Sequence, residues 1–229
     1  MKLTWLGHSA CHIAIGGKSV LIDPFFSGNP KFPSNFESGL ETVDFVMLTH
    51  GHADHLGDSL RLAKNYDATV VAIFEICAYL GAQGIEKTQP MNIGGTIECD
   101  GLSISMVNAL HSSAIVEDGN PITMGDPAGL VIRSSEKTVY HAGDTDVFSD
   151  MALIQRIYKP SVGLIPIGDR FTMGPETAAL ACNEFLDLET IIPIHWGTFD
   201  LLTGDPKTFK SLVKRGNVLT PDPGQAIKL

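Results

Sequence analysis

The sequence predicts an α/β protein in which strands and helices are mixed in both halves of the chain. Three observations indicate this fold class. Short apolar runs of strand-like composition recur along the chain, helix-like segments lie between them, and the 23 glycines and 13 prolines are spread throughout rather than gathered in a linker. A chain of 229 residues can bury a sizeable core, so we expect one domain spanning residues 1–229.

The first half begins with strands. Three strand-like runs, KLTWL, CHIAI and SVLI, are separated by the turns GHS and GGK. A loop rich in proline, glycine and asparagine, DPFFSGNPKFP, follows them. The compact apolar run 43–48 then predicts a buried strand, which ends at a cluster of histidine and aspartate, and residues 56–65 predict a helix.

The second half repeats this pattern more loosely. Residues 129–132 and 138–140 predict strands that lead into HAGDTD. We expect a helix over 151–158, a strand over 162–167, a helix over 175–186 with proline in its first turn, and a strand over 189–194 that ends in HWGTFD. In three places, therefore, metal-ligand residue types begin where a strand ends, which allows them to converge at one edge of a sheet.

Composition excludes several function classes. The 16 Lys and Arg against 26 Asp and Glu give a net charge of −10, without a basic run, so we expect no nucleic-acid binding. The longest apolar stretch, 69–82, is about fourteen residues and carries Glu75, which is too short for a membrane span. The N-terminus lacks the apolar core of a signal peptide, and the four cysteines form no CxxC. We therefore expect reduced thiols and a cytoplasmic location.

The decisive motif is THGHADHL at 49–56, which contains His50, His52, Asp54 and His55. On an extended backbone, residues two apart face the same way, so His50 and His52 can reach one ion together. The chain then turns toward a helix, which re-aims Asp54 and His55 toward a second ion nearby. The pattern HxHxDH would arise about once in 1,500 random sequences of this composition, so it is a specific signal.

Two ions need further ligands, and His111, Asp144 and His195 each follow a strand-like run. Catalytic zinc sites typically use three protein ligands and leave one position open for water. We expect His50, His52 and His111 on one ion, Asp54, His55 and His195 on the other, and Asp144 as a bridge. This imidazole-rich set suits two divalent ions, first of all Zn²⁺, and is also compatible with Mn²⁺ or Fe.

The HxHxDH motif, followed by isolated His, Asp and His at strand ends, resembles the metallo-β-lactamase superfamily. This resemblance covers essentially the whole chain and implies a four-layer αββα sandwich of two pseudo-symmetric halves with a dinuclear site at one edge. The segments WLGHS, DPFFSGNP and PIGDRFTMGP are similar to the small metal-dependent hydrolases that include the L-ascorbate-6-phosphate lactonase. The third histidine departs from the pattern, because it stands in LHSS rather than in a GHTxG-like turn.

The expected activity is hydrolysis by a hydroxide that two divalent metals hold and direct at a small ester, lactone or phosphoester. Asp54 would take up a proton, and His8, at a glycine turn after the first strand, would either protonate the leaving group or serve structurally. The alternatives are an iron-dependent redox enzyme, a phosphodiesterase or nuclease, and a non-catalytic metal-binding module. The expected partner is a small-molecule substrate. We expect no membrane partner, and the sequence is compatible with a homo-oligomer.

Several other residues have a structural as well as a functional interpretation. Asp23, which precedes Pro24, is expected mainly as a turn element, with hydrogen bonding to a metal ligand as the less favoured alternative. Arg170 is expected in a surface ion pair unless it binds a substrate anion. The rings of Phe25, Phe26 and Phe32 could line a ligand site or pack within their loop. His12 is expected to be structural, and His141 is expected to support the metal ligands.

Overall fold

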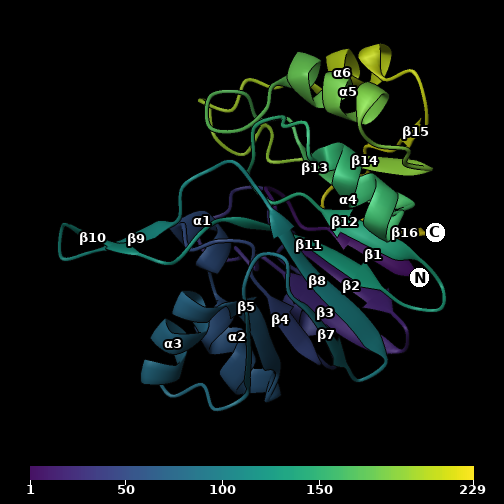
Figure 1. Ribbon diagram of the computed structural model, residues 1–229. Coiled ribbons are helices and arrows are strands. Elements are labelled where there is room, and N and C mark those ends of the chain that lie inside the picture. Colours follow the sequence, from purple (N-terminus) through teal and green to yellow (C-terminus); the bar gives the residue numbers. More distant parts are fainter.

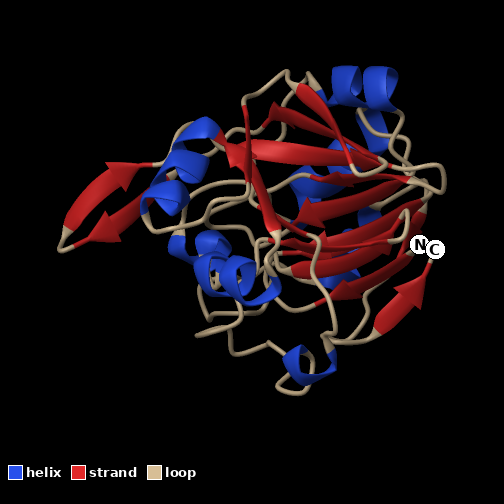
Figure 2. Cartoon of the chain, turned by 90° about the horizontal axis from the view of Figure 1, so that it is seen from below, coloured by secondary structure: helices blue, strands red, loops and turns tan.

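The computed structural model describes residues 1–229 and contains two seven-stranded sheets packed face to face (Figures 1 and 2). The first sheet comprises β1 (Lys2–Trp5), β2 (Cys11–Ile15), β3 (Lys18–Ile22), β4 (Phe45–Met47), β5 (Thr69–Ile73), β6 (Thr88–Met91) and β16 (Ala226–Lys228). Its strand order is β16-β1-β2-β3-β4-β5-β6. The N- and C-terminal strands are thus neighbours, and both termini lie together in Figure 2.

The second sheet is built from the rest of the chain. It comprises β7 (Thr96–Cys99), β8 (Leu102–Asn108), β11 (Ala128–Arg133), β12 (Thr138–His141), β13 (Val162–Pro166), β14 (Thr190–Ile194) and β15 (Asn217–Val218). Its order is β15-β14-β13-β12-β11-β8-β7. The short strands β9 (Ala114–Glu117) and β10 (Asn120–Thr123) form a separate hairpin that projects from the body of the molecule (Figures 1 and 2).

The two sheets share one pairing scheme, which is the internal pseudo-symmetry that the family resemblance implies. In the first sheet, pairing is antiparallel from β16 to β3 and parallel from β3 to β6. In the second sheet, it is antiparallel from β7 to β12 and parallel from β12 to β15. Parallel strands end at the same edge, where open α/β sheets place their ligands. Side chains that follow β4, β12 and β14 are therefore brought together.

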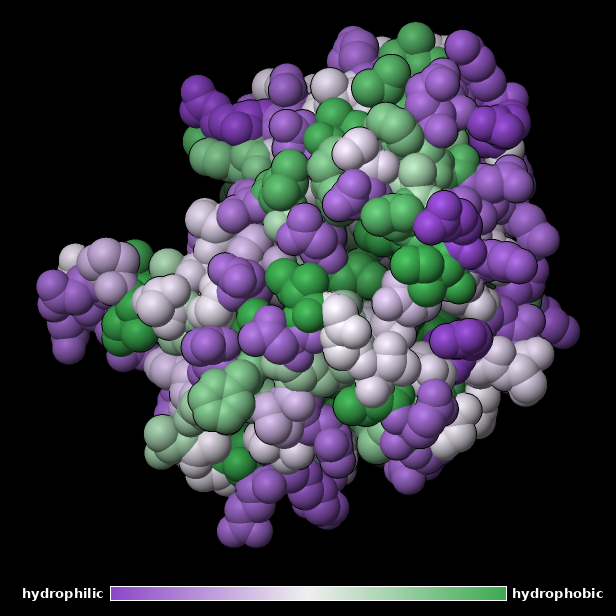
Figure 3. Space-filling view, in the orientation of Figure 1, coloured by the Kyte–Doolittle hydropathy of each residue, from purple (hydrophilic) through white to green (hydrophobic).

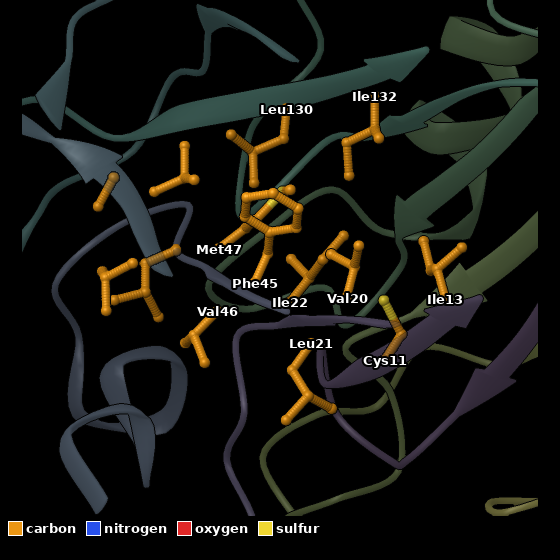
Figure 4. Close-up of a cluster of buried hydrophobic side chains, with 14 of the residues drawn as sticks. Cys11, Ile13, Val20, Leu21, Ile22, Phe45, Val46, Met47, Leu130 and Ile132 are labelled. Carbon is orange, nitrogen blue, oxygen red and sulfur yellow. The ribbon is translucent and has the colours of Figure 1, made fainter. Parts of the chain in front are cut away.

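The core lies between the sheets, and strand alternation assigns each side chain to a layer. Figure 4 shows Val20, Ile22 and Phe45 of the first sheet pointing toward Leu130 and Ile132 of the second. The residue between the last two, Val131, faces the opposite way and packs in a second cluster with the helices beyond. Burial on both faces explains why these strands are continuous apolar runs in the sequence.

Helices cover the outer face of each sheet, which completes the expected αββα sandwich (Figure 1). The first sheet is flanked by α1 (Ala53–Leu56), α2 (Ser59–Tyr66) and α3 (Phe74–Ala82), and the second by α4 (Met151–Tyr158), α5 (Pro175–Glu184) and α6 (Pro206–Leu212). A 3₁₀ turn, η1, spans Glu37–Gly39. None of the helices combines the length and the apolar character that crossing a bilayer requires.

The prediction of one helix over 56–65 is wrong at its start. Residue 56 ends α1, α2 begins at Ser59, and the helical conformation is interrupted at Gly57. Gly57 has φ +44°, and a Cβ there would lie only 2.6 Å from the carbonyl oxygen of Pro24. The next residue, Asp58, accepts hydrogen bonds from the backbone N–H groups of Phe26 and Ser27. The break therefore allows the proline-rich loop to pack against the start of α2.

The elements that were not predicted are α1, α3, α6, η1, β5, β15, β16 and the strands between residues 88 and 123. β5 runs directly into α3, so the apolar stretch 69–82 shows no boundary between strand and helix. The hairpin explains part of this difference: every residue of β10 is exposed, and β9 is at most half-buried. Without a buried face, such strands carry no alternation of apolar and polar residues. In Figure 3 the hairpin stands away from a surface on which apolar residues are scattered among polar ones.

Candidate metal centre

The backbone that presents the first candidate ligands is fixed from two sides. Thr49 donates its backbone N–H to Asp23 Oδ1 at 2.8 Å and its hydroxyl to Asp23 Oδ2 at 2.6 Å. On the other side, a Cβ at Gly51 would lie 2.2 Å from the Cβ of Met124, so only glycine fits there. His50 lies between these two anchor points and is fully buried.

The chain then changes from an extended to a helical conformation. His52 has φ −67° and ψ 150° and precedes the first residue of α1. This helix has only four residues and carries Asp54 and His55. The extended segment and the helical turn therefore direct the two pairs of side chains differently, as the sequence predicted.

All seven candidate ligands meet at one edge of the two sheets, and His8 joins them. They form three groups, within each of which the possible ligand atoms lie no more than 4.8 Å apart. The groups are His50, His52 and His111; His8, Asp54, His55 and His195; and His50, His55 and Asp144.

Asp144 lies between the groups. Its Oδ2 is 3.0 Å from Nε2 of His195, 3.3 Å from Nε2 of His55 and 3.6 Å from Nε2 of His111. Bonds of about 2.0–2.1 Å to a tetrahedral zinc place two of its ligand atoms about 3.3 Å apart. These separations fit ligand atoms that share an ion as well as ordinary hydrogen bonds, and one carboxylate oxygen reaches candidates from both outer groups.

The charge distribution at this point also suits a cation. His55 Nε2 and Asp144 Oδ1 are buried and have no hydrogen-bond partner. Burial lowers the pKa of His55, but the carboxylates of Asp144 and Asp23 outweigh burial and hold that pKa well above its usual value. Burial raises the pKa of Asp144, and the imidazoles of His195 and His55 reverse the effect, so that it lies well below the usual range. The site thus favours a positive charge beside an ionised carboxylate, which a divalent cation provides.

The imidazoles of the group formed by His50, His52 and His111 remain neutral, and neutral imidazole is the form that binds metals. Burial lowers the pKa values of His50, His52 and His111. Because the Thr49 hydroxyl donates to Asp23, its oxygen accepts from Nδ1 of His50 at 3.0 Å, which leaves Nε2 of His50 with a free lone pair. That Nε2 lies 3.0 Å from Nδ1 of His52.

Asp23 does more than form the turn expected from the sequence. It is fully buried, has φ +45°, and its Oδ2 accepts a hydrogen bond from His55 Nδ1 at 2.8 Å. A carboxylate on the far nitrogen of a metal-binding histidine fixes the tautomer and the ring orientation. The sequence favoured the turn role over support of a metal ligand, and the contact with His55 gives Asp23 the supporting role as well.

His8 is buried behind Asp54 and uses both ring nitrogens. Its Nε2 lies 2.9 Å from Asp54 Oδ2, and its Nδ1 lies 3.1 Å from the hydroxyl of Thr198. Burial, partly opposed by the hydrogen bond to Asp54, lowers the pKa of His8 to about 4, so the ring is neutral at pH 7. A neutral ring satisfies both contacts when Nε2 donates to Asp54 and Nδ1 accepts from Thr198. Thr198, in HWGTFD, was not predicted to take part.

The remaining candidates lie outside the cluster. His12 contacts the hydroxyl of Ser19 at 2.9 Å, and His141 donates to the carbonyl oxygen of Ser9 at 3.0 Å. Arg170 is exposed and forms no ion pair, contrary to expectation. The rings of Phe26 and Phe32 stack on each other with a centroid distance of 4.2 Å. Phe25 lines a cleft beside Asp54.

Comparison with known proteins identifies the family. A family model described as the Beta-lactamase superfamily domain matches residues 18–196. A UPF0173 metal-dependent hydrolase of Chelativorans sp. is 50% identical over 234 residues, which span 100% of both chains. A UPF0173 metal-dependent hydrolase of Methanopyrus kandleri is 50% identical over 214 residues, covering 93% of this chain and 92% of the relative. This chain belongs to the UPF0173 metal-dependent hydrolases.

The UPF0173 chain also has a similar solved structure. Igni18, a metallo hydrolase from the archaeon Ignicoccus hospitalis, superimposes with a TM-score of 0.89 at 37% identity, covering 99% of this chain and 97% of Igni18. These matches confirm three sequence predictions: the superfamily resemblance, the α/β sandwich fold and the assignment as a metal-dependent hydrolase.

Proposed function

We propose that this hydrolase cleaves a small ester, lactone or phosphoester with two divalent cations, zinc first among the metals considered. His50, His52 and His111 would hold one ion, and Asp54, His55 and His195 the other, with Asp144 between them. The observation that carries the proposal is the position of Asp144 Oδ2, which lies within 3.6 Å of imidazole nitrogens from both groups. The orphaned buried atoms of His55 and Asp144 support it as well.

When bound, such ions lower the pKa of water from about 15.7 to near 7 and stabilise the oxyanion that develops during hydrolysis. The chain's own residues would orient the reaction and move protons. Asp54 Oδ2 would accept the proton that the attacking water releases and pass it toward the leaving group, while the His8 Nε2–H, 2.9 Å from that oxygen, orients the carboxylate. His8 itself would protonate the leaving group only after Nδ1, which faces the Thr198 hydroxyl at 3.1 Å, has gained a proton, because loss of Nε2–H from a neutral ring would leave an anion.

The test combines metal analysis of purified protein with a screen of generic esters, lactones, thioesters and phosphodiesters. We expect two divalent ions per chain and metal-dependent turnover of at least one substrate class. Asp54→Ala should abolish turnover and lower the metal content, and His8→Ala should slow turnover with the metal intact. His12→Ala is the matched control, because that histidine lies outside the three groups.

Several outcomes would contradict the proposal. An Asp54→Ala protein that keeps both ions and full activity would exclude the role given to Asp54. Iron in aerobically purified protein, together with oxygen consumption, would favour a redox enzyme on the same fold. A full metal complement without turnover of any substrate class would favour a metal-binding module.

A further inference from the structure

A cleft at the protein surface borders the candidate metal cluster at Asp54. It has a volume of about 490 Å³, within the range of pockets that bind small molecules. Seven residues line it: Phe25, Ser27, Ala53, Asp54, Gly57, Asp58 and Phe199. Because Asp54 belongs both to this lining and to the ligand cluster, a group bound in the cleft lies next to the cluster.

Two phenyl rings form the apolar walls of this cleft. The ring centroids of Phe25 and Phe199 lie 6.4 Å apart with 40° between the ring planes. Both rings also contact the imidazole of His8, with centroid distances of 5.7 Å and 5.8 Å. Phe199 remains 43% exposed, so its face is available to a ligand without any rearrangement of the core. Paired aromatic walls of this kind bind flat or alkyl groups through apolar contact.

The cleft offers no free donor to an anion. Its lining contains neither lysine nor arginine. The Asp58 carboxylate accepts the backbone N–H groups of Phe26 and Ser27, at 3.0 Å and 2.7 Å, and the Ser27 hydroxyl at 2.7 Å. Arg61 also donates to Asp58, from Nε at 3.2 Å and from Nη2 at 3.0 Å. The Asp58 carboxylate therefore already uses these donors, and an anion in the cleft would lie beside Asp54 and Asp58 without a positively charged partner among the lining residues.

We propose that this cleft binds an uncharged apolar group of the substrate, an aryl or short alkyl chain. The proposal rests on the hydrolase function above and narrows its substrates to those whose group in the cleft is uncharged, so that a distal carboxylate or phosphate in the cleft is excluded. For an ester or lactone, the balance of the reaction is simple. In the reaction, the acyl C–O bond breaks, the water oxygen bonds to the carbonyl carbon, and one water proton ends on the released alcohol oxygen.

Binding of two small probes to the metal-loaded protein tests the cleft directly by saturation-transfer NMR. We expect 2-phenylethanol to bind and benzenesulfonate, an anion that coordinates metals weakly, to show no saturable binding. Phe199→Ala should weaken binding of 2-phenylethanol about tenfold, as expected for loss of an apolar wall. Phe171→Ala is the matched control, because Phe171 is 53% exposed and lies outside the cleft lining. Equal binding of benzenesulfonate, or binding of 2-phenylethanol that ignores Phe199, would overturn the proposal.

Hydrolysis of two matched esters separates this proposal from the proposed function. The probes are 4-nitrophenyl hexanoate and mono-4-nitrophenyl adipate, which differ by a distal carboxylate. We expect kcat/KM to favour the hexanoate by about tenfold or more, and Phe199→Arg, unlike Phe171→Arg, to narrow that ratio. A ratio near one in the wild type would overturn the cleft proposal while leaving the hydrolase intact. If neither ester is cleaved, the ester-hydrolase proposal fails, and the NMR experiment still decides what the cleft binds.

Discussion

The two ends of the metal centre differ in how the protein holds them. At the end formed by Asp54, His55 and His195, the two histidines are buried. His55 has Asp23 behind it, and Asp54 has His8. Asp54 itself is 34% exposed. At the end formed by His50, His52 and His111, His50 is fully buried, the other two imidazoles are partly exposed, and the Ser112 hydroxyl lies 3.3 Å from Nε2 of His52.

This difference indicates which ligand positions the core determines and which the loops determine. Asp23 directly follows β3, so packing of the first sheet fixes the ring of His55. His111 belongs to the irregular segment between β8 and the projecting hairpin, and no hydrogen bond of its ring to a supporting carboxylate corresponds to that between His55 and Asp23. We therefore expect the buried end to be preorganised for its ion and the open end to adapt on binding.

The largest expected effect comes from the residue that joins the two ends. Asp144→Asn keeps the size of the side chain and removes the charge between the groups. Metal ions contribute several kcal/mol to such reactions and each 1.36 kcal/mol is a factor of ten, so we expect kcat/KM to fall about 10³-fold with loss of bound metal. Metal analysis and steady-state kinetics measure both effects. Full metal occupancy in the variant would show that Asp144 does not join the ends.

Next in size is the stability difference between the ends. In the folded wild-type protein, the His55 imidazole lies between the buried carboxylates of Asp23 and Asp144. In chelator-treated protein, His55→Ala leaves these two carboxylates buried without that partner, so we expect the free energy of unfolding to fall by about 3 kcal/mol. His52→Ala removes a partly exposed ring and should cost less than about 0.5 kcal/mol. Urea denaturation measures both values. Equal losses would remove the distinction between a buried and an open end.

A smaller effect is expected at Asp23, which contacts a candidate ligand rather than an ion. Asp23→Asn weakens the hydrogen bond to His55 Nδ1 without creating a cavity, and asparagine tolerates the positive φ at this position. Loss of such a supporting carboxylate typically lowers metal affinity by about 10–100-fold. Asp44→Asn is the control, because Asp44 accepts from the backbone N–H of Ser19 and contacts no candidate ligand. Metal affinity can be measured by competition with a chromophoric chelator, and equal affinities for both variants would contradict the prediction.

The sequence predicts the ligands that lie close together in the chain, and most of the strands buried on both faces, better than the supporting residues and the periphery. His50 to His55 are adjacent in the chain, so their spacing alone predicted a metal motif, and strands buried on both faces appear as apolar runs. Asp23 and Thr198 gave no such signal, because their role depends on contacts with His55 and His8 across 32 and 190 positions of the chain. The hairpin lacks a buried face, and so its pattern is not periodic.

The smallest expected effect concerns the pH dependence of stability that comes from His12, a histidine outside the candidate metal centre. Burial, with a contribution from Lys2, lowers the pKa of His12 from 6.5 to about 4, although this ring lies outside both ends. Between these two values the unfolded chain binds the proton more readily, so the stability contributed by neutral His12 is present above pH 6.5 and is lost as the pH falls toward 4. After allowance for partial exposure, His12→Gln should reduce the loss of unfolding free energy between pH 7 and pH 4 by about 1–2 kcal/mol. Urea denaturation at several pH values measures the two slopes. The pH dependence that remains in the variant belongs to the other titrating groups, including histidines of the candidate metal centre. Identical slopes in the variant and the wild type would contradict the prediction, because they would show that His12 is protonated equally in the folded and unfolded chain.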